Sequence, residues 1–119
     1  MPESSDITPQ QRVQLIDTQL AHLWMVRTFL KHAEETEEDE ELQEVARDLY
    51  DYMLALGNPL SSEDWPGYLK TAKKKLARLK RTDVLFQEIQ PEISNHTNFK
   101  MAAVSCHEVV SEVERLLGS

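Results

Sequence analysis

The sequence has a single cysteine, no long apolar run and no internal repeat. With Cys106 alone, the chain cannot form an internal disulfide framework, which fits a reducing compartment. No apolar stretch approaches the roughly 18 residues that a membrane-spanning helix requires. The segment from Met1 to Asp6 is polar and acidic, unlike a signal peptide. These absences predict a cytoplasmic protein that neither spans nor binds a membrane.

Apolar residues, in contrast, are abundant and regularly spaced. They make up 40% of the 119 residues, enough for one domain with its own core. They recur at steps of three, four and seven in four blocks, so each block predicts an amphipathic helix. The blocks are Val13 to Leu30, Leu42 to Leu56, Trp65 to Leu79 and Phe99 to Leu116.

Capping residues punctuate these blocks. Thr8, Pro9 and Gln11 have the pattern of a capping box with a proline in the first turn. Gly57-Asn58-Pro59 predicts a stop with glycine in the left-handed conformation, and Pro91 predicts the end of the third helix. We therefore expect an all-α, single-domain, antiparallel (up-down-up-down) four-helix bundle over residues 8–118. Its helices span about 8–34, 37–57, 62–90 and 98–117, after a flexible N-terminus at 1–7.

Charge is distributed unevenly along the chain, whose net charge is −8. Residues 34–41 hold seven acids, whereas residues 70–81 hold seven basic residues and no acid. The negative total argues against nucleic-acid binding, and no aromatic residue stands among the lysines to stack on bases. In an antiparallel bundle the second and third helices lie side by side, with Glu44 near Lys75 and Asp48 near Thr71. We therefore expect the basic run to be screened within the molecule.

Arg27 is the strongest anomaly in the first helix. Helical spacing places it within about 20° of Ile16 on the core-facing arc. A buried guanidinium is very costly without a carboxylate partner. Asp48 and Asp83 are the two candidates, and Asp83 occupies a heptad position where an apolar residue is expected. The sequence predicts a buried ion pair that fixes helix register, or alternatively an anion-binding site.

The outer face of the first helix is a candidate interface. Met25 and Phe29 share one stripe, with His22 and His32 at its edges. Further apolar residues fall on the predicted outer faces of the third and fourth helices, namely Leu85, Ile89, Met101 and Val104. Several such residues on neighbouring helices indicate a surface that binds a protein partner or a second copy.

No pattern of metal ligands or cofactor binding emerges. Helical di-metal sites need a carboxylate three residues before a histidine, and Gln19, Phe29 and Val104 hold those places before His22, His32 and His107. Two local patterns resemble known families. The arginine–histidine spacing from Arg27 to His32 is similar to that of HEPN ribonucleases, but on a helix the two side chains point about 140° apart. The acids at 37–41, followed by Asp48 and Asp51, resemble motifs of MazG-type pyrophosphohydrolases, which need two facing helices. Neither resemblance assigns a family.

The sequence therefore predicts a non-enzymatic helical module that self-associates or docks a protein partner, without metal or cofactor. The alternative is a small protein or enzyme that binds an anionic or phosphate-bearing ligand through Arg27 with Asp48 or Asp83.

Overall fold

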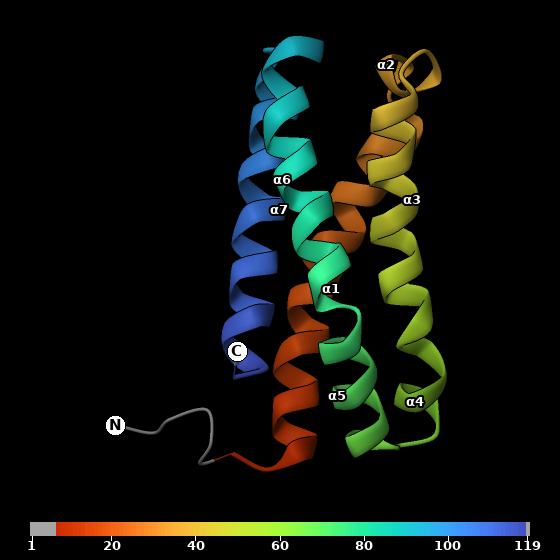
Figure 1. Cartoon of the computed structure of the whole chain (residues 1–119), viewed down its shortest axis with the longest axis vertical. Coiled ribbons are helices and arrows are strands. Elements are labelled where there is room, and N and C mark those ends of the chain that lie inside the picture. Colours follow the sequence, from red (N-terminus) through yellow and green to blue (C-terminus); the bar gives the residue numbers. More distant parts are fainter. Residues whose placement is uncertain (1–6, 119) are drawn as a thin grey trace.

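The computed structural model describes residues 7–118, so the predicted flexible N-terminus lies, apart from Ile7, outside the described residues. Within them the chain is entirely helical and forms no strand (Figure 1). The helices are α1 (Pro9–His32), α2 (Glu34–Glu37), α3 (Glu40–Ala55), α4 (Gly57–Ser61), α5 (Trp65–Lys74), α6 (Leu76–Ile93) and α7 (Thr97–Leu116). None of the described helices is long and apolar enough to cross a membrane.

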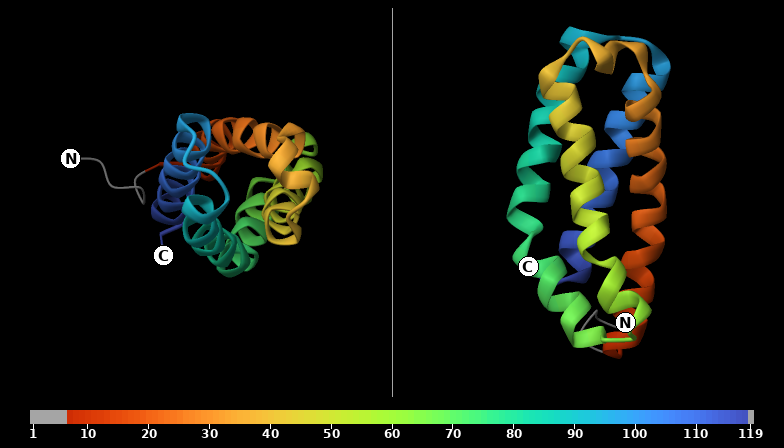
Figure 2. Two further views of the ribbon diagram at one scale, coloured as in Figure 1. Left: turned by 90° about the horizontal axis from the view of Figure 1, so that it is seen from above. Right: turned by 90° about the vertical axis from the view of Figure 1, so that its right-hand side faces the viewer.

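The long helices pack around a single apolar core. α1 contacts α3 on one side and α7 on the other, and α6 contacts the same two helices from across the core. Seen from above, the helices close a ring around it (Figure 2). The core takes one stripe from each, including Val13, Ile16, Leu20 and Leu23 of α1, Leu42, Val45 and Leu49 of α3, Leu79 and Phe86 of α6, and Cys106, Val109 and Val113 of α7. The predicted helical periodicity is confirmed.

Polar side chains start the helices, and the predicted capping box is present. The Thr8 hydroxyl accepts from the Gln11 N–H at 3.1 Å, and the Gln11 amide oxygen accepts from the Thr8 N–H at 2.9 Å. Asp39 caps α3 and Asp64 caps α5. The last long helix is capped by the His96 imidazole, which accepts from the Asn98 N–H.

The predicted third helix is wrong in its continuity, because it is broken at Lys75 into α5 and α6. A buried side chain explains the break. The Tyr52 hydroxyl donates to the Ala72 carbonyl oxygen at 3.0 Å, and this oxygen is the one the Leu76 N–H would use in an uninterrupted helix. Side chains that insert into the helical ladder bend or interrupt it.

Two predicted stops also differ from the structure. α3 ends at Ala55 as expected, but Gly57 does not take the left-handed conformation; it begins α4. Pro59 fits there because the first turn of a helix has N–H groups without helical partners. The left-handed residues in the described chain are Glu63 (φ 56°) and Gly118 (φ 78°). Pro91 lies inside α6, where it is exposed and only three residues from the C-cap.

Candidate functional site

A shallow groove between α1 and α7 coincides with the predicted interface on α1. It has a volume of about 300 Å³. Four residues of each helix line it: His22, Met25, Val26 and Phe29 from α1, and Asn98, Met101, Ala102 and Ser105 from α7. We call this set the α1/α7 groove. Both quartets follow the three-and-four spacing that keeps residues on one face of a helix.

The groove exposes large apolar side chains to solvent. Met25 is 66% exposed and Met101 is 56% exposed, and Val104 on the next outward position of α7 is 53% exposed. Ala102 and Ser105 are small, so they leave room between the two methionines. Methionine is flexible and polarizable, and it is over-represented on surfaces that accept more than one partner. The arrangement therefore suits the docking of an apolar ridge.

Phe29 forms the inner wall of the groove. Its ring meets that of Phe99 edge to face, with 5.0 Å between the ring centroids, and it packs against the core. The prediction that Phe29 points away from the core is therefore wrong. α1 has neighbours on two sides, so its apolar arc is wider than a single stripe.

The other predicted interface residues are placed differently. His32 is exposed one turn beyond Phe29 but does not line the groove. Ile89, expected on an outer face, is buried at 5% exposure, and Leu85 is half-buried against the core. The eight lining residues include no carboxylate, lysine or arginine. The groove is thus a neutral strip in a chain where 29% of residues are charged.

Arg27 does not form the predicted ion pair. Its side chain is half-buried, and its guanidinium carbon lies 4.8 Å from the ring centroid of Trp24 and 4.4 Å from that of Tyr50. Among residues 7–118 its recorded contacts are these two cation–π stacks. Val26 and Leu30 take the core-facing positions at this height. The guanidinium is moved aside to the α1/α3 seam, where aromatic faces stabilise it without a carboxylate.

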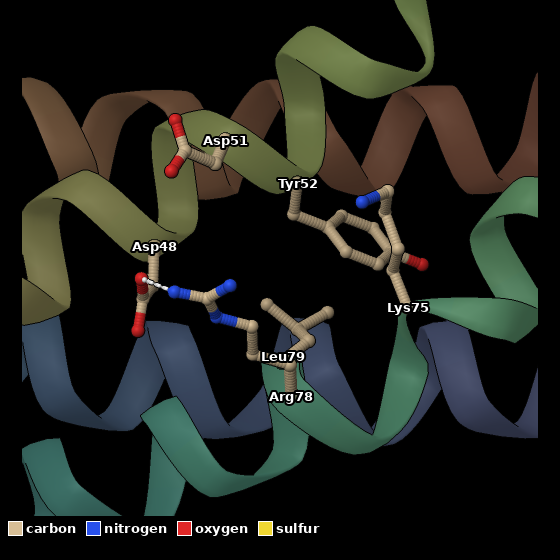
Figure 3. Close-up of a pocket in the computed structure, with 6 residues that line it drawn as sticks. All are labelled: Asp48, Asp51, Tyr52, Lys75, Arg78 and Leu79. Carbon is tan, nitrogen blue, oxygen red and sulfur yellow. Dashed lines mark hydrogen bonds and ion pairs between the residues drawn. The ribbon is translucent and has the colours of Figure 1, made fainter.

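Asp48 pairs with residues of α6 and not with Arg27. Its carboxylate accepts from Arg78 at 3.0 Å and from the Thr82 hydroxyl at 3.2 Å. Figure 3 shows this pair beside Tyr52 and Lys75 at the rim of a pocket of about 40 Å³. Such a volume has room for a few water molecules. The carboxylate is satisfied within the chain, and the pocket is too small for an organic ligand.

The same contact shows why the expected register was wrong. Asp48 was expected at the height of Thr71, two turns before Arg78. The five residues of α4 lengthen the joint between α3 and α5, so a later part of the next helix reaches the height of Asp48. Heights counted from a simple turn at Gly57 leave out the five residues of α4, which the sequence pattern did not predict.

Asp83 is buried and joins α6 to α7. It bonds the His107 Nδ1 at 2.8 Å and accepts from the Gln87 amide at 3.1 Å. Its carboxylate raises the pKa of His107, chiefly through this hydrogen bond. Burial, and then the nearby Asp83 charge, raise the pKa of the Cys106 thiol. A buried thiol held in its protonated form is a poor nucleophile, so Cys106 is not placed for nucleophilic chemistry.

The Asp83 contact could have been anticipated only in part. An acid at a heptad core position signals a buried polar contact, but its partner depends on the height at which α6 meets α7. Within the part of the chain that is described, no group of three histidine, cysteine or acidic side chains is placed to hold a metal ion.

No protein-family model matches the chain. No curated protein and no solved structure matches it either.

Proposed function

We propose that this protein is a non-enzymatic interaction module of the four-helix-bundle type that docks a helix in the α1/α7 groove. The observation that carries the proposal is the groove itself, a neutral depression flanked by Met25 and Met101, both more than half exposed. Apolar side chains of two packed helices with small residues between them form the kind of surface into which an amphipathic helix lays its apolar face.

The energetics fit a moderate affinity. Burying one methionine or phenylalanine contributes roughly 1.5–3 kcal/mol, and ordering two partners opposes this gain. Met25 and Met101 alone would not hold a partner. The half-buried Phe29 and the 53% exposed Val104 add apolar surface beside them, so a helix of three or four turns can bury several apolar groups at once.

The experiment uses a fluorescent amphipathic peptide of about 16 residues, with leucines at steps of three and four and glutamine or alanine elsewhere. We expect it to bind the parent chain and to lose at least about tenfold in affinity with Met25→Glu/Met101→Glu, because each carboxylate would have to be desolvated. Leu54→Glu is the matched control. Leu54 is a 61% exposed apolar residue on α3, away from the groove, and its substitution should leave binding unchanged.

Light scattering at several concentrations identifies the occupant of the groove. A dimer in the parent chain that dissociates in Met25→Glu/Met101→Glu places a second copy there. A monomer that binds the peptide indicates a foreign partner. The proposal is wrong if the parent chain neither associates nor binds the peptide, or if the double variant behaves as the parent does.

A further inference from the structure

A second surface lies on the outer side of α5 and α6 and differs from the groove in charge. It carries exposed basic residues that we call the cationic ridge: Lys70, Lys73, Lys74 and Arg81. The basic run was expected to be screened by acids of the neighbouring helices. In the structure only Arg78, through Asp48, and Lys80, through Glu114, have an acidic partner. The four ridge cations form no ion pair with any residue in 7–118.

An apolar strip runs along the same face of α6. Ala77, Val84 and Leu85 line an open depression of about 580 Å³, together with Lys80, Arg81 and Glu88. Val84 is 56% exposed. Ala77 and Val84 are separated by seven residues, so they lie on one face of the helix about 10 Å apart along its axis. Lys80 and Arg81 therefore flank an apolar strip of about two helical turns on α6, and the α5 lysines precede it along the chain.

We propose that the cationic ridge and its apolar strip bind an acidic amphipathic helix of a partner protein, independently of the α1/α7 groove. Glutamate and aspartate side chains on the partner would pair with Lys70, Lys73, Lys74 and Arg81. Leucine-like side chains at helical spacing would cover Val84 and Ala77. Charge complementarity of this kind accelerates encounter and fixes the partner's register.

The chemistry of the ridge favours this occupant over two others. Nucleic acid is disfavoured by the net charge of −8, and no aromatic side chain between residues 70 and 85 is available to stack on bases. A second copy would have to offer its acidic run at 34–41. That run contains no apolar residue, so it would leave the strip at Val84 uncovered.

The test is a titration of a fluorescent peptide with leucines at helical spacing and glutamates elsewhere, at about 50 mM salt. Two control peptides separate the contributions: one replaces the leucines with glutamine and the other replaces the glutamates with lysine. We expect the acidic amphipathic peptide to bind most tightly. Affinity should fall at least about tenfold in Lys73→Gln/Lys74→Gln/Arg81→Gln, because three charge pairs are lost.

Further variants locate the binding. Val84→Ser should weaken binding several-fold, while Lys100→Gln, which removes an exposed lysine of α7, should have no effect. Met25→Glu/Met101→Glu should also leave binding unchanged, and this separates the ridge from the groove. The inference is overturned if the leucine-free peptide binds equally well, if binding survives the triple substitution, or if duplex DNA binds the parent more tightly than the peptide and loses affinity in the triple variant.

Discussion

The α1/α7 groove and the cationic ridge both expose groups that lack a partner within the described chain, but the groups differ in kind. The groove is a shallow, neutral depression, and its unsatisfied element is apolar surface at Met25 and Met101. The ridge is charged, and its unsatisfied element is a set of cations without acidic partners among the described residues. Binding in the groove should therefore change little with salt, whereas binding at the ridge should weaken as salt screens the charges.

The inner seams of the molecule provide the contrast. Asp48 and Asp83 are nearly buried, and each has two hydrogen-bond partners within the chain. Buried polar groups must be satisfied internally, while exposed groups need not be. The exposed apolar and cationic side chains of the two outer surfaces are therefore the groups available to a partner.

The largest expected effect comes from Phe29→Glu. Because Phe29 packs on Phe99 and the core, introducing a carboxylate there should lower the free energy of unfolding by about 2–4 kcal/mol. Met25→Glu, one turn away, should change it by no more than about 0.5 kcal/mol, and so should Lys73→Gln/Lys74→Gln on the ridge. Chemical denaturation of the four proteins checks this. A Phe29→Glu protein as stable as the parent would show that Phe29 does not pack against the core.

Asp83→Ala should have the next largest effect, because Asp83 joins α6, which carries the ridge, to α7, which lines the groove. Losing its bonds to His107 and Gln87 should lower the free energy of unfolding by about 1–2 kcal/mol. Asp83→Asn can still accept hydrogen bonds and should cost less. Equal losses for the two variants in thermal unfolding would show that hydrogen bonding at this position is unimportant.

Arg27→Ala tests the seam behind the groove. Loss of the cation–π contacts with Trp24 and Tyr50 should cost about 1 kcal/mol, well below the roughly 3–5 kcal/mol expected for breaking a buried ion pair. Arg27→Lys keeps the charge but loses the planar stacking, so it should be destabilised nearly as much. A loss of 3 kcal/mol or more in Arg27→Ala would restore the ion-pair hypothesis.

The smallest expected effect is a pH dependence from His107. Asp83 raises the folded-state pKa of His107 above its ordinary 6.5. The folded state therefore binds this proton more tightly than the unfolded state. The resulting stabilisation is complete below the ordinary pKa and is lost as pH rises through the raised one. Unfolding curves from pH 6 upward should show the parent losing stability relative to His107→Gln. Parallel pH profiles for the two proteins would contradict the assignment.

The comparison also shows what sequence reasoning can reach. Helical periodicity and capping residues predicted every long helix, since both depend on local spacing. The break at Lys75 was not predictable, because it depends on the Tyr52 hydroxyl arriving from another helix. For the same reason, Met25 and Phe29 were recognised from one helix, whereas their meeting with Met101 and Ser105 required the packing of α1 against α7.

The predicted partner of Arg27 was wrong for a geometric reason. A helical wheel assumes a straight helix, but small departures in direction decide whether a side chain faces the core or a seam. In the seam, the rings of Trp24 and Tyr50 stabilise the guanidinium in place of a carboxylate.

The central claim, that the α1/α7 groove docks a helix, is tested most directly by nuclear magnetic resonance. Backbone amide shifts of the chain are followed while the neutral amphipathic peptide is added. We predict that the largest changes cluster at residues 22–29 of α1 and 98–105 of α7, and that they disappear in Met25→Glu/Met101→Glu. Changes centred on residues 70–85, or spread evenly over the molecule, would contradict the claim.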